Sequence, residues 1–365
     1  MLKQQKIFFD FLRFCIGSAK EIPGSLKEVD WKELYAIAQK QALLGVLFHG
    51  IQRLPKELAP EQKLLMQWMV MAEQIRKQNI RLFLDSVKVC KNFENKGFAN
   101  CIFKGQGNAL LYPDPYMRTP GDIDIYLAGG RKRVMQYINK VCPNQVMRYH
   151  HVDFPVMKTA IEVHFTPSYM FFPVHNRRMQ KWFGKVMDLQ CSNVVTLPDG
   201  YGEITVPTMN FNVIYILSHL YRHVFTEGIG LRQLIDYYFV LVKSEERRVK
   251  NLTALQRELK YLGLWKFAGA VMYVLHEALG LPEAKMIAPI DVNEGRFLLA
   301  EIMRGGNFGQ YDTRLGSKEN EGKLHRYLRM SFRNLRFMKH YPTEALSEPL
   351  FRTWFALWKK IHRMK

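Results

Sequence analysis

The sequence lacks a long apolar segment. Its uncharged apolar runs are much shorter than the about 20 residues that a membrane-spanning helix needs. Near the N-terminus, Asp10 and Arg13 stand where a signal peptide would have its apolar stretch. We therefore expect neither a transmembrane segment nor an export signal, and a cytoplasmic protein.

Cysteine is scarce. The five cysteines are an odd number, lie far apart and form no C-x-x-C pair. This pattern argues against a disulfide framework and against the commonest zinc and redox motifs, and it suits a reducing compartment. Internal repeats and low-complexity tracts are also missing. With 48% hydrophobic residues, a chain of 365 residues has enough core material for two or three domains.

Acidic residues are too few to balance the basic ones. The chain has 53 Lys and Arg against 33 Asp and Glu, which gives a formal net charge of +20. Such a charge favours polyanionic partners such as nucleic acid, nucleotides or an anionic membrane surface. The plain alternative is that the excess Lys and Arg only solvate the surface.

Hydrophobic spacing divides the chain into three parts. Residues 6–51 fit two or three short helices, and residues 60–95 fit one long helix with no Gly or Pro inside it. Short segments follow, with strands expected at 98–103, 123–127, 148–154 and 159–165, a turn and short helix at 104–111, and a helix at 134–141. Helical spacing returns at 211–225, 231–242, 254–261 and 265–279. We predict an α+β fold, with a small mixed-sheet core at 98–206 between helical regions at 1–97 and 207–365.

Paired carboxylates lie on one of the expected strands. Residues 121–126 read Gly-Asp-Ile-Asp-Ile-Tyr, and strand alternation places Asp122 and Asp124 on one face. On a later strand, alternation places Glu162 and His164 together in the same way. Three converging carboxylates suit Mg²⁺ and phosphoryl chemistry. The alternative is that Asp122 caps a turn and Asp124 is a solvated strand residue.

The surroundings of this strand carry a wider pattern. From Lys104 to Tyr126 the chain resembles the nucleotidyltransferase superfamily with the DNA polymerase β-like fold, and within it a bacterial branch of uncharacterised nucleotidyltransferases. The motifs that carry the resemblance are Lys104-Gly105, Tyr112-Pro-Asp-Pro-Tyr-Met-Arg118, Gly121-Asp-Ile-Asp124, Glu162-Val-His164, His219-Leu-Tyr-Arg-His223 and Leu231-Arg-Gln-Leu-Ile-Asp236.

The resemblance implies a metal-dependent enzyme. In that superfamily two Asp of one strand and a third acid bind metal ions, so it assigns two Mg²⁺ ions to Asp122, Asp124 and Glu162, with Glu162 either completing the site or acting as base. A nucleoside monophosphate would pass from ATP or another NTP to a hydroxyl of a small molecule, an RNA or a protein. The rival hypothesis is a nucleotide- or RNA-binding module that has the fold without turnover.

The expected phosphate-binding residues differ from those of better-known members. A Gly-Ser pair usually grips the phosphates, whereas residues 104–108 here read Lys-Gly-Gln-Gly-Asn. Lys104 and the backbone around Gly105 are the expected replacements, since amides at a helix start and a full positive charge bind anions. Arg118 is expected to bind the triphosphate, and its alternative is a structural salt bridge to an Asp.

Other titratable residues have plainer explanations. His219 and His223 have a zinc-binding spacing, but packing or substrate contact is expected because no third ligand is evident. Arg232 and Asp236 have the spacing of a helix ion pair, although a role facing the cleft is the alternative. Metal binding by the segment His150–Asp153 is not expected, because alternation would point its two histidines to opposite faces.

The C-terminal segment is strongly basic. From Lys323 onward it has eleven Lys or Arg against two Glu. Its arginines share one helical face and its apolar residues another, which predicts a helix packed on the body with a solvated basic rim. The alternatives are a groove for RNA or another polyanion, or contact with an anionic bilayer aided by Trp354 and Trp358. The two faces consist of Arg326, Arg329, Arg333 and Arg336, and of Leu324, Leu328, Phe332, Leu335 and Met338.

Overall fold

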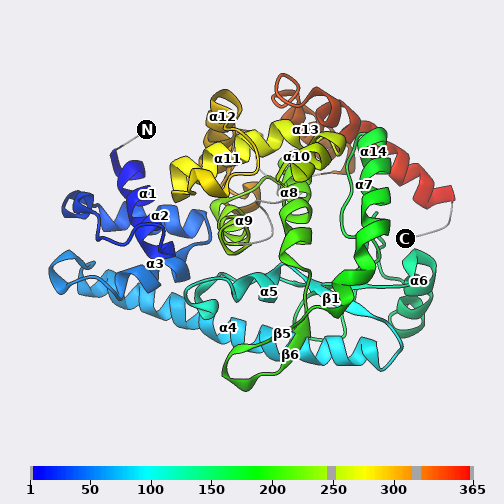
Figure 1. Ribbon diagram of the computed structural model, residues 1–365, viewed down its shortest axis with the longest axis horizontal. Coiled ribbons are helices and arrows are strands. Elements are labelled where there is room, and N and C mark those ends of the chain that lie inside the picture. The colour runs from blue at the N-terminus through cyan, green and yellow to red at the C-terminus, as the bar shows by residue number, and fades with distance from the viewer. Residues whose placement is uncertain (1–2, 245–251, 315–321, 362–365) are drawn as a thin grey trace.

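The computed structural model describes residues 3–244, 252–314 and 322–361. It confirms the predicted α+β class, because a small mixed sheet lies between two groups of helices (Figure 1). Among the described residues, no helix is both long enough and apolar enough to cross a membrane.

The N-terminal region consists of three short helices and one long helix. The short ones are α1 (Lys3–Ile16), α2 (Trp31–Lys40) and α3 (Leu44–Ile51). Asp30 caps α2 by accepting bonds from the backbone amides of residues 32 and 33. The predicted long helix is confirmed as α4 (Gln62–Glu94), which runs along the lower edge of the molecule in Figure 1.

The sheet has four strands in the order β1-β2-β4-β3. They are β1 (Asn100–Phe103), β2 (Ile123–Leu127), β3 (His151–Asp153) and β4 (Ile161–His164). The strands β2 and β4 pair in parallel, while β1 with β2 and β3 with β4 pair antiparallel. The predicted pairing of the last two strands is therefore confirmed.

The two faces of the sheet have different partners. Ile123, Ile125 and Val163 lie in a buried cluster with side chains of α4 and of α6 (Gly130–Val141). On the other face, Phe103 stacks near Phe211 of α8 (Met209–Thr226). Because alternate residues face opposite sides, the polar strand residues lie on the side of α8.

Some core elements are missing from the sequence prediction. They are the short helix α7 (Pro173–Val186) and the two-stranded sheet of β5 (Val194–Thr196) and β6 (Glu203–Thr205). In α7 only Met179 and Phe183 are buried, and most of its other residues are polar or charged. The short helix α5 (Gly105–Ala109) follows β1 as predicted.

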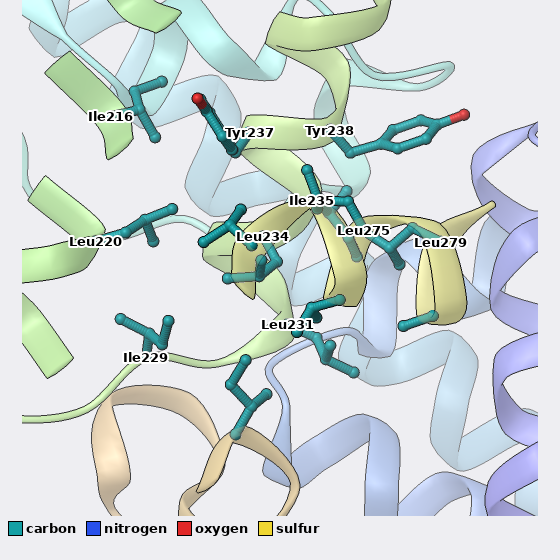
Figure 2. Close-up of a cluster of buried hydrophobic side chains, with 14 of the residues drawn as sticks. Ile216, Leu220, Ile229, Leu231, Leu234, Ile235, Tyr237, Tyr238, Leu275 and Leu279 are labelled. Carbon is teal, nitrogen blue, oxygen red and sulfur yellow. The ribbon is translucent and has the colours of Figure 1, made fainter. Parts of the chain in front are cut away.

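The C-terminal helices build the largest buried cluster. They are α8, α9 (Leu231–Lys243), α10 (Leu252–Tyr261), α11 (Trp265–Leu279), α12 (Val292–Gly305), α13 (Lys323–Leu335) and α14 (Pro342–Ile361). The side chains labelled in Figure 2 include residues of α8 (Ile216 and Leu220), α9 (Leu231, Leu234 and Ile235) and α11 (Leu275 and Leu279), with Ile229 from the segment between α8 and α9. The same cluster includes residues of α1 and α3. The division at residues 97 and 206 stays a prediction.

The orientation of α13 is opposite to the prediction. Leu324 and Phe332 are 72% and 62% exposed, whereas Arg333 is 8% exposed. Arg333 is therefore buried and Arg329 and Arg336 are half-buried, whereas Arg326 is exposed and most of the apolar face turns outward. The sequence pattern identified the two faces correctly but assigned them to the wrong sides, because it assumed that the apolar face is the buried one.

A buried ion pair joins the core to α9. Arg118 donates from Nε to Asp236 Oδ1 at 2.8 Å and from Nη2 to Oδ2 at 2.7 Å, and Tyr112 donates its hydroxyl to the same carboxylate at 2.7 Å. Burial alone would raise the pKa of Asp236, but Arg118 and the hydroxyl bond hold it below the ordinary value. The pair fixes the loop before β2 against the C-terminal helices.

We predict that Asp236→Asn destabilises the protein by about 3–5 kcal/mol, because it leaves the guanidinium of Arg118 buried without its counter-charge. Urea unfolding at neutral pH measures this. The matched control is Glu73→Gln, which removes an exposed pair with Lys77 on α4 and should change stability by less than about 0.5 kcal/mol. Equal effects of the two substitutions would contradict the structural role of Arg118.

Candidate active site

A cavity of about 1080 Å³ lies on the polar side of the sheet. Its lining includes Asp122, Asp124 and Glu162, together with residues of α8, α13 and α14. The structure thus brings the three predicted carboxylates together in one cavity. Lys104 lines it as well, whereas Gly105 and Arg118 are not part of the lining.

Strand register places two of the acids. Asp124 of β2 pairs in parallel with Glu162 of β4, so their side chains lie next to each other on one face. His151 of β3 pairs with His164 of β4 and adds imidazoles to that face. Asp122 immediately precedes β2, at the mouth of this group of side chains.

The buried carboxylate of Asp124 already has two close partners. Lys104 Nζ lies 3.0 Å from Oδ2, and His164 Nε2 lies 2.9 Å from Oδ1. Burial opposes ionisation, but Lys104 and His164 outweigh it and hold the pKa of Asp124 far below its ordinary value. The bonds to Asp124 and Glu162 in turn overcome the effect of burial on His164, and raise its pKa. Asp124 is therefore charge-compensated without a metal ion.

Lys104 adopts a backbone conformation that is uncommon for a side-chain-bearing residue. Its φ of 53° and ψ of −127° lie in the region that favours glycine. In this conformation its ammonium reaches Asp124 and also lies 3.1 Å from His219 Nε2. The local strain positions the charge of Lys104 in the cavity.

Asp122 forms no ion pair within 4 Å among the described residues, in contrast to Asp124. The charge of Asp124 raises its pKa from the ordinary 3.8 to about 6, with further contributions from burial and from Glu162. A carboxylate with a raised pKa beside a second carboxylate gains from a divalent cation. Of the three acids, Asp122 is thus the one whose ionised form an added cation would stabilise most.

Glu162 faces the histidines. Its Oε2 lies 3.4 Å from His151 Nδ1 and 3.6 Å from His164 Nε2. Burial raises its pKa and the bond to His164 lowers it, with a net shift downward. A carboxylate with a lowered pKa is a good ligand and a weak proton acceptor. Of the two roles expected for Glu162, the geometry favours that of a ligand.

The expected separation of His150 and His151 is wrong. Their rings lie 4.4 Å apart, and His151 Nδ1 is 3.2 Å from His150 Nε2. Alternation does not apply because β3 begins at His151, so His150 lies in the bend before the strand. Both histidines are buried and line the cavity.

The other histidine pair has a cation between its rings. Arg222 Nη2 lies 3.3 Å from His219 Nδ1 and 3.0 Å from His223 Nε2. Arg222 Nη2 is thus within hydrogen-bond distance of both rings. That His219 and His223 do not ligate zinc stays a prediction.

Two residues expected to bind phosphate lie away from the cavity lining. The guanidinium of Arg118 is taken up by Asp236, which is the alternative that the sequence left open. Gly105 is buried, and a Cβ there would approach the backbone of Asp122. Arg232 lines the cavity instead and donates to the carbonyl of Thr119 at 3.0 Å, rather than forming the expected pair with Asp236.

Basic residues outnumber acidic ones around the cavity. Nine Lys or Arg line it against six Asp or Glu, and several come from α13 and α14. The spacing of the arginines in the C-terminal segment predicted a basic helix face. That this face lines the same cavity as the acids follows only from the tertiary structure. The basic residues are Lys104, Arg148, Arg222, Arg232, Arg326, Arg329, Arg333, Arg352 and Lys359.

Comparison with known proteins identifies the family. A family model described as an uncharacterised nucleotidyltransferase matches residues 27–280, more than half of the chain. The chain therefore belongs to this nucleotidyltransferase family. The match includes all three candidate acids and ends before α13. No curated protein and no solved structure gave a significant match.

We predict that Asp122→Asn stabilises the metal-free protein at pH 7.5 by about 1–3 kcal/mol. An acid whose pKa is higher in the folded than in the unfolded state costs stability when it ionises. For Asp122 this cost is absent below pH 3.8, grows up to about pH 6 and is full above it. The advantage of the variant should therefore shrink as the pH falls from 6 to 4.

Denaturant unfolding of both proteins in EDTA at several pH values measures the difference. Glu203→Gln, which removes an exposed carboxylate on β6, is the control and should show no such trend. An Asp122→Asn variant that is less stable than the parent at pH 7.5, or whose advantage does not depend on pH, would contradict the assigned repulsion.

Proposed function

We propose that this protein is a metal-dependent nucleotidyltransferase that moves a nucleoside monophosphate from an NTP to a hydroxyl acceptor. The observation that carries the proposal is the convergence of Asp122, Asp124 and Glu162 in one cavity that arginines of α13 and α14 also line. Acids on the neighbouring strands β2 and β4, with a further acid directly before β2, also support placement in the DNA polymerase β-like superfamily.

The donor set fits Mg²⁺. Carboxylate oxygens are the ligands that this ion prefers, and the raised pKa of Asp122 marks a charge that lacks compensation. Asp122 and Asp124 would hold two ions, with Glu162 as a further ligand. The ions would supply charge neutralisation at the phosphates and would lower the pKa of the acceptor hydroxyl.

The residues of the chain position the substrates and balance their charge. Lys104 would exchange part of its contact with Asp124 for a phosphate oxygen once metal ions neutralise the carboxylate. Arg232 lies beside Gly121 and Asp122, where it would bind the triphosphate in place of Arg118. We assign Gly105 no contact with phosphate. Its role is to form the backbone turn that places Lys104.

The reaction would be an in-line displacement at the α-phosphorus. The hydroxyl oxygen of the acceptor forms a new P–O bond, and the bond from the α-phosphorus to the bridging oxygen breaks. Pyrophosphate leaves with the electron pair, and the hydroxyl proton passes to solvent or to a nearby base. Positioning and charge stabilisation supply most of the acceleration in such reactions.

The basic wall favours an anionic acceptor. The arginines of α13 and α14 line the same cavity as the acids. The cavity volume, about 1080 Å³, is slightly above the range of about 300–1000 Å³ that is typical of small-molecule sites. The cavity thus has room for a nucleotide and a second group, such as a small anionic molecule or the end of an RNA or protein chain. Contact of the C-terminal region with RNA or with an anionic membrane surface stays a prediction.

We predict that the protein transfers label from an α-³²P-labelled NTP, and not from a γ-labelled one, to a component of a host lysate in the presence of Mg²⁺. Asp122→Asn or Asp124→Asn should reduce the transfer by about 100- to 1000-fold or more, because each removes charge at the metal site. The matched control is Asp188→Asn, at an exposed residue outside the cavity.

Full label transfer by the Asp122→Asn, Asp124→Asn double variant would contradict the site assignment. Transfer of the γ label instead would show phosphoryl rather than nucleotidyl transfer. Circular dichroism of each variant separates loss of activity from loss of fold.

A nucleotide-binding module without turnover is the second candidate. Grouped acids alone do not exclude it, because Lys104 and His164 compensate Asp124 without metal. Calorimetry with each NTP separates the two: we predict that binding weakens strongly when Mg²⁺ is removed with EDTA. Equal affinity with and without Mg²⁺ would favour the module.

A further inference from the structure

Beside the carboxylates, three imidazoles form a compact group. One ring nitrogen of each of His150, His151 and His164 lies within 4.8 Å of the other two. The rings come from the bend before β3, from β3 and from β4, so backbone pairing of the two strands brings the last two together. All three side chains are at least 95% buried and border the cavity.

Two of these nitrogens already have the spacing of ligands on one ion. His150 Nε2 and His151 Nδ1 are 3.2 Å apart. A tetrahedral ion with bonds of about 2.0–2.1 Å holds neighbouring ligand atoms about 3.3–3.4 Å apart. Glu162 Oε2, at 3.4 Å from His151 Nδ1, stands beside the group.

The contacts of the third ring suit metal binding. His164 bonds through Nε2 to Asp124, and its Nδ1 is buried without a hydrogen-bond partner. A carboxylate bonded to the outer nitrogen is the usual support of a metal-bound histidine.

The kind of ion follows from the donor atoms. Imidazole nitrogens suit Zn²⁺ and neighbouring transition metals, whereas Mg²⁺ takes oxygen ligands. Three histidines with one position open to a cavity are a known zinc arrangement in enzymes. The cavity gives an ion access to the group.

We propose that His150, His151 and His164 form a binding site for a divalent transition metal ion, with Zn²⁺ the best fit, separate from the carboxylate site for Mg²⁺. The site would take one ion per chain and would keep it in the presence of excess Mg²⁺. It does not require nucleotidyl transfer, so its test and the test of the proposed function can fail independently.

The experiment is calorimetric titration of the full chain with Zn²⁺ in excess Mg²⁺, with Co²⁺ absorption as a second readout of nitrogen coordination. The parent protein should bind one tight Zn²⁺. A His150→Asn, His151→Asn double variant should bind Zn²⁺ more than about 100-fold more weakly than the parent protein. This loss is larger than the loss of affinity expected when only a residue that supports a ligand is removed. His223→Asn, which removes another cavity histidine, and Asp122→Asn should leave the affinity unchanged.

X-ray absorption of the Zn²⁺-loaded parent protein provides a test without substitutions, in case the double variant fails to fold. Scattering from three imidazoles supports the site. Absence of tight binding in excess Mg²⁺, coordination without imidazole, or loss of binding in His223→Asn with full binding in the double variant would each overturn it.

Discussion

The candidate site depends on the parallel pairing of β2 with β4. This register puts Asp124 next to Glu162 and directs both toward α8, while Ile123, Ile125 and Val163 enter the apolar core on the opposite side. A shift of one residue would move the acids into that core and the isoleucines into the cavity. Burial of one sheet face therefore fixes the position of the acids on the other, so that the stability of the core and the geometry of the site have the same origin.

Electrostatic balance is the second constraint on the cavity. Two of the acids are largely compensated by Lys104 and by histidines, whereas Asp122 is not, which is why its pKa rises to about 6. On the opposite side, α13 turns its arginines inward and exposes Leu324 and Phe332. Exposing these apolar side chains costs free energy. The same orientation of α13 brings its positive charges to the cavity.

Local patterns predicted most of the fold. The long helix α4 and the strand β2 could be predicted from the hydrophobic spacing of their own residues. The pairing of β3 with β4 could be predicted because the two strands are close along the chain. The helix α7 was not predicted, because it is polar on average and has few apolar residues to mark it. In the site, the motif around Asp122 identified the acids, but the partner of Arg118, the meeting of His150 with His151 and the inward face of α13 depend on contacts between distant segments, which no local spacing encodes.

We propose above all that one cavity binds a metal–nucleotide complex between the acids in and beside the sheet and the basic residues around them. A crystal structure with Mg²⁺ and a non-hydrolysable NTP analogue is the decisive measurement. We expect Mg²⁺ between the triphosphate and Asp122 and Asp124, with phosphate oxygens near Lys104 and Arg232. A triphosphate bound outside the cavity, or bound within it without metal contact to either aspartate, would contradict this arrangement.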